Sequence, residues 1–364
     1  MKNQTSRLAY SSKQVQRTGI KNPLLIIILF IGMKYPARAQ DPSFSQFFAS
    51  PLTLNPALTG KFDGSVRVAG NYRDQWPTVN KAFITSTVSV DLGILQNKLS
   101  QNDRFGIGFM AMTDKTADGI LTSNYFSFST AYQKAIDEDG QHQIGVGFQG
   151  TYANKLLDGP RLRFLDGLQV DGTWLPSPTE QENLEQVTAH YFDMNAGILY
   201  NGSLNGTNAV FFGASLYHLN QPKESFLGVD NITIPTRLTI HAGGYFPSAD
   251  KGTSWYVSAL YNRQATASEF VVGGALELSV GADQNYPVNF YLGSWVRINN
   301  VTDAIIPYIG LDYGSFNLGM TYDVNVSAFK VASQERGGVE ISLIYTLKHS
   351  DDGQSVHAVQ CPRF

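Results

Sequence analysis

The sequence predicts an all-β fold, a single closed transmembrane antiparallel β-barrel of about 14 strands that follows a cleaved signal peptide. Three observations support this prediction. The chain begins with an export signal, most of the remainder alternates large apolar with small or polar residues, and charged residues are scarce. Together they indicate strands that face lipid on one side and water on the other.

The first 39 residues have the order of a secretory signal peptide. Basic residues such as Lys2 and Arg7 precede an apolar run at 24–31, and Ala37-Arg38-Ala39 follows. This order predicts cleavage between Ala39 and Gln40. The alternative, a membrane-spanning anchor, is disfavoured because the apolar run is much shorter than the roughly 20 residues that a spanning helix needs.

The composition differs from that of a nucleic-acid-binding protein and of an ordinary soluble enzyme. The chain has 27 basic and 30 acidic residues, so no nucleic-acid partner is expected. Charged residues make up 16%, against about a quarter in a typical globular protein. Cys361 is the only cysteine, which excludes an intramolecular disulfide and a cysteine-rich metal site. It either pairs with another chain after export or is simply tolerated.

Alternation with a period of two is the dominant pattern after Gly60. In the stretch 144–152, even positions are large and apolar or aromatic and odd positions are small or polar. Each such segment is about ten residues long, which suits a tilted membrane-crossing strand better than the five or six residues of a soluble sandwich strand. The expected strands lie near 64–74, 82–92, 104–113, 123–133, 142–153, 190–200, 209–219, 236–246, 254–263, 269–279, 287–297, 304–313, 315–325 and 337–347.

The two faces of these strands also fit a membrane barrel. Many segments begin or end on an aromatic residue, such as Tyr152 or Trp255, as expected of aromatic girdles at the two membrane interfaces. The opposite face carries Gly, Ser, Thr and Asn with scattered charges such as Arg67 and Asp323, which suits a water-filled lumen. The sheet has to close because an open edge cannot lie in lipid.

Loop lengths suggest an orientation in the cell outer membrane. If the N-terminus is periplasmic, the longest connections, 154–189 and 220–235, face outward and the tight turns face the periplasm. We therefore expect both termini to be periplasmic. The expected organisation is a signal peptide (1–39), a periplasmic or plug-like N-terminal segment (40–60), the barrel (61–348) and a periplasmic C-terminal tail (349–364).

The segments outside the alternating pattern resemble a known family. Residues 40–48 (QDPSFSQFF) and 55–60 (NPALTG) are similar to the mature start of PorP/SprF proteins, and 71–77 (NYRDQWP) resembles a motif in which members commonly have Asn where this chain has Asp74. The late strands at 307–313 and 317–325 and the closing Cys-Pro-Arg-Phe also resemble that family. The similarity covers the mature chain.

This resemblance implies an outer-membrane barrel associated with the type IX secretion system of Bacteroidetes. Its expected role is to support secretion or surface attachment of a large adhesin or gliding-type protein. The implied partners are outer-membrane lipid, a secreted surface adhesin, and type IX secretion and periplasmic cell-wall-linked components. A passive porin or a hydrophobic-solute transporter is the alternative, because both would have the same strand pattern.

The sequence gives little support for an enzyme, a cofactor or a metal. Among the histidines, His241 is expected in the lumen but has no nucleophile motif or acidic partner beside it in the sequence. The run 137–140 (DEDG) resembles part of a calcium loop but lacks the downstream glutamate, and Asp and Gly are expected in a tight turn in any case. No catalytic residue, cofactor or metal is predicted.

Aromatic residues outside or between the strands are the candidate partner contacts. Trp76 and Trp174 lie in predicted outward loops, where exposed aromatics on a rigid scaffold make good contact residues. Trp76 is equally well explained as part of the upper aromatic girdle. On the periplasmic side the candidates are Phe44, Phe47, Phe48 and Arg363.

Overall fold

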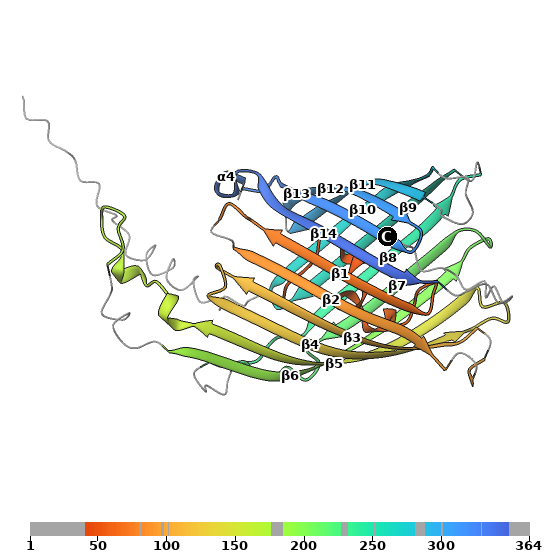
Figure 1. Ribbon diagram of the computed structural model, residues 1–364, viewed down its shortest axis with the longest axis horizontal. Helices are drawn as coiled ribbons and strands as arrows, with labels where there is room; N and C mark the ends of the chain where they lie inside the picture. Colours follow the sequence, from red (N-terminus) through yellow and green to blue (C-terminus); the bar gives the residue numbers. More distant parts are fainter. Residues whose placement is uncertain are drawn as a thin grey trace, which may run out of the picture. The chain divides into compact units, whose positions relative to one another are not determined.

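Antiparallel strands joined in chain order close into a barrel in the computed structural model of this protein (Figure 1). The structure describes residues 41–79, 82–95, 98–100, 102–175, 185–226, 232–249, 252–280, 288–299, 301–328 and 330–348. The strands are β1 (Val66–Gln75), β2 (Phe83–Ile94), β3 (Arg104–Thr116), β4 (Leu121–Ala135), β5 (His142–Asp158), β6 (Gln186–Ser203), β7 (Ala209–Tyr217), β8 (Arg237–Pro247), β9 (Thr253–Gln264), β10 (Ala267–Ser279), β11 (Val288–Asn299), β12 (Val301–Tyr313), β13 (Phe316–Asn325) and β14 (Arg336–Leu347).

The predicted fold class is confirmed, because the 14 expected segments correspond one to one with β1 to β14. The barrel closes where β1 pairs with β14, from Val66↔Leu347 to Gln75↔Gly338. This pairing gives the first and last strands a neighbour on each side, as a sheet in lipid requires. The largest differences from prediction are in β5 and β6, which extend beyond the expected 142–153 and 190–200.

Side chains alternate across the barrel wall as the pattern predicts. On β5, Val146 and Phe148 point outward and are 43% and 62% exposed, whereas Gln149 and Thr151 point into the lumen and are buried. The outer face is therefore apolar and the inner face polar. This arrangement of apolar and polar faces is the reverse of that in a water-soluble barrel, and it suits a barrel surrounded by lipid.

The connections divide the barrel into two ends. We call the "loop end" the one that carries the connections from each odd-numbered strand to the next, including the two longest, 159–185 and 218–236. Short helical turns η4 (Gly159–Arg161), η5 (Leu165–Gly167) and α4 (Lys330–Ser333) also lie there. The "turn end" carries the other connections, the start of β1 and the end of β14.

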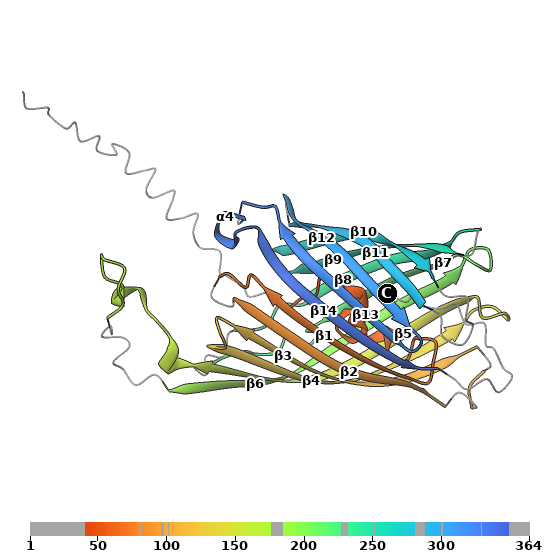
Figure 2. The same ribbon diagram turned by 45° about the horizontal axis from the view of Figure 1, so that its top comes forward.

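An N-terminal segment with three short helical turns lies inside the ring of strands (Figure 2). These turns are η1 (Phe47–Ala49), α2 (Pro51–Leu54) and η2 (Pro56–Leu58). Proline opens both α2 and η2, where its missing N–H removes no hydrogen bond, and the Asn55 side chain caps η2 by accepting from Ala57 N at 2.8 Å. Within the described ranges, no helix is long and apolar enough to cross a bilayer.

Candidate functional site: a lumen filled by the N-terminal segment

Residues 41–60, which we call the "plug", run through the lumen from the loop end to the turn end. Asp41 contacts Gln264 at the end of β9 and Arg237 at the start of β8, both at the loop end. Gly60 donates its N–H to Asp91 in the half of β2 that lies near the turn end, at 2.7 Å. The plug therefore contacts both mouths of the barrel.

The path of the plug could not be read from the sequence, because its irregular residues have no periodicity. Asp41 lies at the loop end, whereas Lys348 follows β14 at the turn end. The plug therefore crosses the full lumen before β1 begins. The two termini, which were expected in the periplasm, lie outside the described residues.

Ionic contacts hold the first described residue of the plug at the loop end. The Asp41 carboxylate lies 3.2 Å from Arg237 Nη1 and 2.7 Å from His218 Nε2. The opposite ring nitrogen of His218, Nδ1, is 3.0 Å from Asp193 Oδ2, so His218 lies between two carboxylates. We call this group, with Gln264, the "Asp41 latch".

The latch perturbs the titration of its members. Burial alone would lower the pKa of the His218 imidazole, but the carboxylates of Asp193 and Asp41 outweigh burial and raise this pKa from 6.5 to about 9. Burial would likewise raise the pKa of the Asp41 carboxyl, yet Arg237 and His218 hold that pKa well below its ordinary value. Both groups are therefore charged at neutral pH.

A second polar contact lies deeper, where the plug backbone meets β14. Ser45 N and Gln46 N both donate to the buried Glu340 carboxylate, at 2.7 and 2.9 Å. Beside it, Asp323 accepts from Ser45 Oγ at 2.8 Å and pairs with Arg73 at 3.1 Å and Arg297 at 2.8 Å. Buried charges need such partners, because an unpaired charge in a low-dielectric interior is strongly destabilising.

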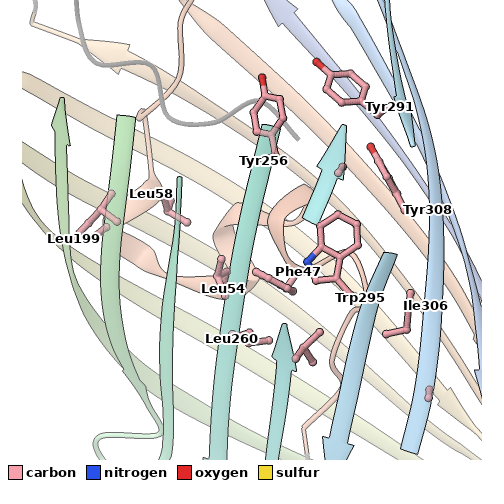
Figure 3. Packing of buried hydrophobic residues seen from close by; sticks show 14 residues of the cluster. Phe47, Leu54, Leu58, Leu199, Tyr256, Leu260, Tyr291, Trp295, Ile306 and Tyr308 are labelled. Carbon is pink, nitrogen blue, oxygen red and sulfur yellow. The ribbon is translucent and has the colours of Figure 1, made fainter. Parts of the chain in front are cut away.

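Aromatic side chains from the wall pack around the middle of the plug. The ring of Phe48 lies 4.9 Å from that of Trp295 and 5.6 Å from that of Tyr308, and Phe47 belongs to the same buried cluster (Figure 3). Trp295 and Tyr308 are inward-facing and almost completely buried. They provide an apolar contact surface for the plug in an otherwise polar lumen.

Glycines in the wall let the plug backbone lie directly against the strands. A methyl group at Gly147 on β5 would overlap the backbone of Pro56 and Ala57, and one at Gly197 on β6 would overlap the Asn55 side chain. Asn55 Nδ2 donates to Ile198 O at 2.9 Å. The glycines that interrupt the inner face of these strands thus form a seat for the Asn-Pro-Ala turn.

Charged and polar groups at the turn end hold the last part of the plug. Arg67 pairs with Asp91 at 2.8 Å and donates to Leu58 O at 3.1 Å. Gly60 adopts φ +70° and its Cα lies so close to Gly106 that no side chain fits between them. Lys61 donates to Gln143 of β5. The plug is therefore held at both mouths and in the middle.

The predicted contact residues fall into three groups. Phe44 and Phe47 are buried inside the barrel and Phe48 packs against Trp295, so contact with another protein requires the plug to leave the lumen. Trp174 is 44% exposed in the β5–β6 connection. Trp76 is half-buried after β1, with its ring 5.7 Å from that of Phe83. Arg363 lies outside the described residues, as do the predicted cleavage site at Ala39 and Gln40 and the cysteine Cys361.

The residues considered for chemistry have structural contacts. His241 lies 3.1 Å from Asn55 Nδ2 of the plug and against the Phe211 ring. The Asp137 carboxylate accepts from the backbone of Gln141 and His142 and so closes its own turn. Enzymatic and metal-binding roles for these residues gain no support from these contacts.

The sequence did not reveal which wall residues hold the plug. Glu340 was not singled out, because Ser45 and Gln46, which donate to it, lie 295 and 294 residues away in the sequence. One signal was present. Leu199 interrupts the alternation of β6, and it is 1% exposed in the cluster that contains Leu58 of the plug. Large apolar residues in the polar phase of a membrane strand mark places where the lumen is filled.

Comparisons with known proteins give one family match and several structural ones. A family model described as "Type IX secretion system membrane protein PorP/SprF" matches residues 37–345. No curated protein matches the chain.

The solved structures that the chain matches share little sequence identity with it. The CymD monoaromatic hydrocarbon channel has TM-score 0.44 and 12% identity, over 83% of this chain and 93% of that one. A Pseudomonas aeruginosa FadL homologue has TM-score 0.43 and 9% identity, over 80% and 92%. BamA from Haemophilus ducreyi, lacking POTRA domains 1–3, has TM-score 0.39 and 10% identity, over 78% and 70%.

Proposed function

This chain belongs to the PorP/SprF family of type IX secretion system membrane proteins, and from this premise we propose that it supports secretion or surface attachment of a large adhesin or gliding-type protein. A closed barrel in this family is an outer-membrane protein. The proposed role is docking of another protein, without catalysis, cofactor or metal. Its proposed partners are the secreted adhesin, other type IX secretion and periplasmic cell-wall-linked components, and the surrounding lipid.

The filled lumen is the observation that favours docking over solute passage. A porin needs a continuous aqueous path, whereas here the plug contacts the wall from the Asp41 latch to Gly60. Its hydrogen bonds and ion pairs reach strands on all sides of the barrel, including β14, β6 and β2. The plug can leave the lumen only if all these contacts break together. A barrel that opens only in this way is unsuited to rapid passive exchange of small molecules.

The loop end offers the surface that a secreted protein would contact. β5 and β6 project beyond their neighbours (Figure 1), and the connection between them carries exposed apolar side chains. Val170 is fully exposed, Leu165 is 79% exposed and Leu175 is 56% exposed, beside Trp174. Exposed apolar residues in one short segment are typical of protein contact sites.

The test is deletion of the gene, followed by an inventory of cell-surface and culture-medium proteins. We expect one large protein to be lost from the surface and restored by the wild-type gene. A variant that lacks residues 165–175 but keeps β5 and β6 should not restore it. An unchanged surface inventory together with impaired uptake of a small solute would contradict the proposal and favour the transporter alternative.

A further inference from the structure

β6 is twice as long as its neighbour β7. It has 18 residues against 9, and their pairing runs only from Ser203↔Ala209 to Ala196↔Leu216. On its other side β6 pairs with β5 along the whole length, as far as Gln186↔Asp158. The first ten residues of β6 therefore extend past β7 in the hairpin that projects at the loop end (Figure 1).

The connection after β7 uses part of this overhang. Leu219 N donates to Met194 O at 2.9 Å, and the Asn220 amide group donates to Phe192 O at 2.7 Å and accepts from Met194 N at 3.0 Å. These contacts show that Phe192 and Met194 direct their backbone groups toward the β7 side. The backbone N–H and C=O groups of successive residues point to opposite sides of a strand. Those of Gln186, Thr188 and His190 therefore also point toward the β7 side.

No described residue pairs with this outer stretch of β6 on the β7 side. The described part of the β7–β8 connection lies instead against the inner face of the hairpin. Glu224 pairs with Lys155 of β5 at 2.8 Å, and Ile234 packs with Ala153 and Tyr191. Toward the part of the chain that the structure describes, the N–H and C=O groups of Gln186, Thr188 and His190 thus form an open strand edge.

The sequence of this edge contains none of the usual protection against pairing. Natural edge strands commonly carry Lys, Pro or a bulge, whereas 186–190 reads Gln-Val-Thr-Ala-His and its pairing with β5 is regular. Gln186, Thr188 and His190 are polar and exposed, which places the edge beyond the lipid-facing Phe192. It is therefore accessible from water at the loop end.

We propose that the edge of β6 from Gln186 to His190 binds an extended segment of the docked surface protein by β-strand addition. This inference rests on the proposed function for the presence of that protein at the loop end. Backbone groups of the added segment would pair with those of Gln186, Thr188 and His190. The exposed apolar side chains near Trp174, on the same hairpin, would provide side-chain contacts.

A second copy of this chain does not fit the edge. Two barrels in one membrane are related by an axis along the membrane normal. Both β6 strands would therefore run in the same direction across the membrane. With the roughly 40° tilt of barrel strands, two such edges would cross at about 80°. Paired strands differ by only about 25°. This excludes pairing of two copies through their β6 edges, and the occupant that we propose is a segment of a different protein.

The test compares Thr188→Pro with Thr188→Ala in cells that lack the wild-type gene. Proline removes the Thr188 N–H from the edge, which an unpaired edge tolerates, whereas alanine changes only the side chain. The measurement is the surface amount of the large protein that gene deletion removes. We expect a loss of roughly tenfold for Thr188→Pro, the effect of one hydrogen bond and the neighbouring contacts. Thr188→Ala should stay near wild type.

Equal surface amounts in the proline variant and the wild type would overturn the strand-addition proposal while leaving the docking role intact. If gene deletion removes no surface protein, the docking role itself fails, and strand addition fails with it. Correct folding of the proline variant is checked by heat-modifiable gel mobility.

Hydrogen exchange on the unmodified full-length protein gives a second test that needs no variant. The amides of Thr188 and His190 should exchange rapidly in the purified barrel and at least about tenfold more slowly in its complex with the surface protein. Unchanged exchange at both amides in that complex would also overturn strand addition.

Discussion

The backbone N–H of Gln46 in the plug donates to Oε1 of Glu340 on β14 at 2.9 Å, across a separation of 294 residues. The contact joins the plug to β14, the strand that closes the barrel against β1. The wall thus helps to fix the position of the plug. The stability of the plug and that of the barrel are therefore coupled.

Glu340→Ala should destabilise the folded protein by about 3 kcal/mol, because it removes the acceptor of two plug amides and leaves Arg73 with one fewer buried carboxylate. Urea unfolding in detergent micelles measures this. Asp139→Ala, in an exposed turn, is the matched control and should shift stability by less than about 0.5 kcal/mol. Equal stability of the two variants would show that the plug contributes nothing through this contact.

Stability should fall as pH rises through the titration of the Asp41 latch. The folded-state pKa of His218 is raised to about 9 from 6.5, so its contribution is complete below pH 6.5 and is lost as pH rises through 9. That difference corresponds to roughly 3 kcal/mol. Asp41 has a lowered pKa and stays ionised throughout this pH window, so it does not contribute to the change of stability with pH.

Thermal unfolding in detergent between pH 6.5 and 9.5 measures this dependence. The control is His218→Gln, which keeps a polar side chain but cannot be protonated, and its stability should change little over the same window. If wild type and His218→Gln show the same pH slope, His218 does not carry the effect.

Gly147→Ala should displace the Asn-Pro-Ala turn, because the added methyl overlaps the backbone of Pro56 and Ala57. Overpacking of this kind destabilises by about 1–3 kcal/mol. Gly70→Ala on β1 is the control, since the nearest atom to its methyl would be 3.8 Å away. Limited proteolysis of folded protein should cleave residues 41–60 faster in Gly147→Ala than in Gly70→Ala. Equal cleavage would show that the glycine seat does not hold the plug.

Much of the barrel was predictable because lipid on one face and water on the other impose alternation on each strand. The outer ends of β5 and β6 were not predictable. Beyond the membrane both faces of a strand meet water, so nothing requires apolar and polar residues to alternate. Residues 155–158 and 186–189 therefore gave no clear pattern, although they pair regularly.

The plug itself could be recognised as irregular but not placed. Its turns are short, and contacts such as that of Ser45 with Asp323, 278 residues apart, hold it in the lumen. Nothing local to residues 41–60 specifies them. The inward Leu199 and Trp295 were the informative exceptions, because a lumen filled only with water gives no reason for large apolar side chains there.

Planar-bilayer recording is the most direct measurement of the filled lumen on which this account depends. Purified wild-type protein should show no steady conductance, because residues 41–60 occupy the barrel. A variant that lacks residues 41–60, with heat-modifiable mobility confirming a closed barrel, should show large steady openings. Steady conductance of the same size in wild type and deletion variant would contradict the account and identify the protein as an open pore.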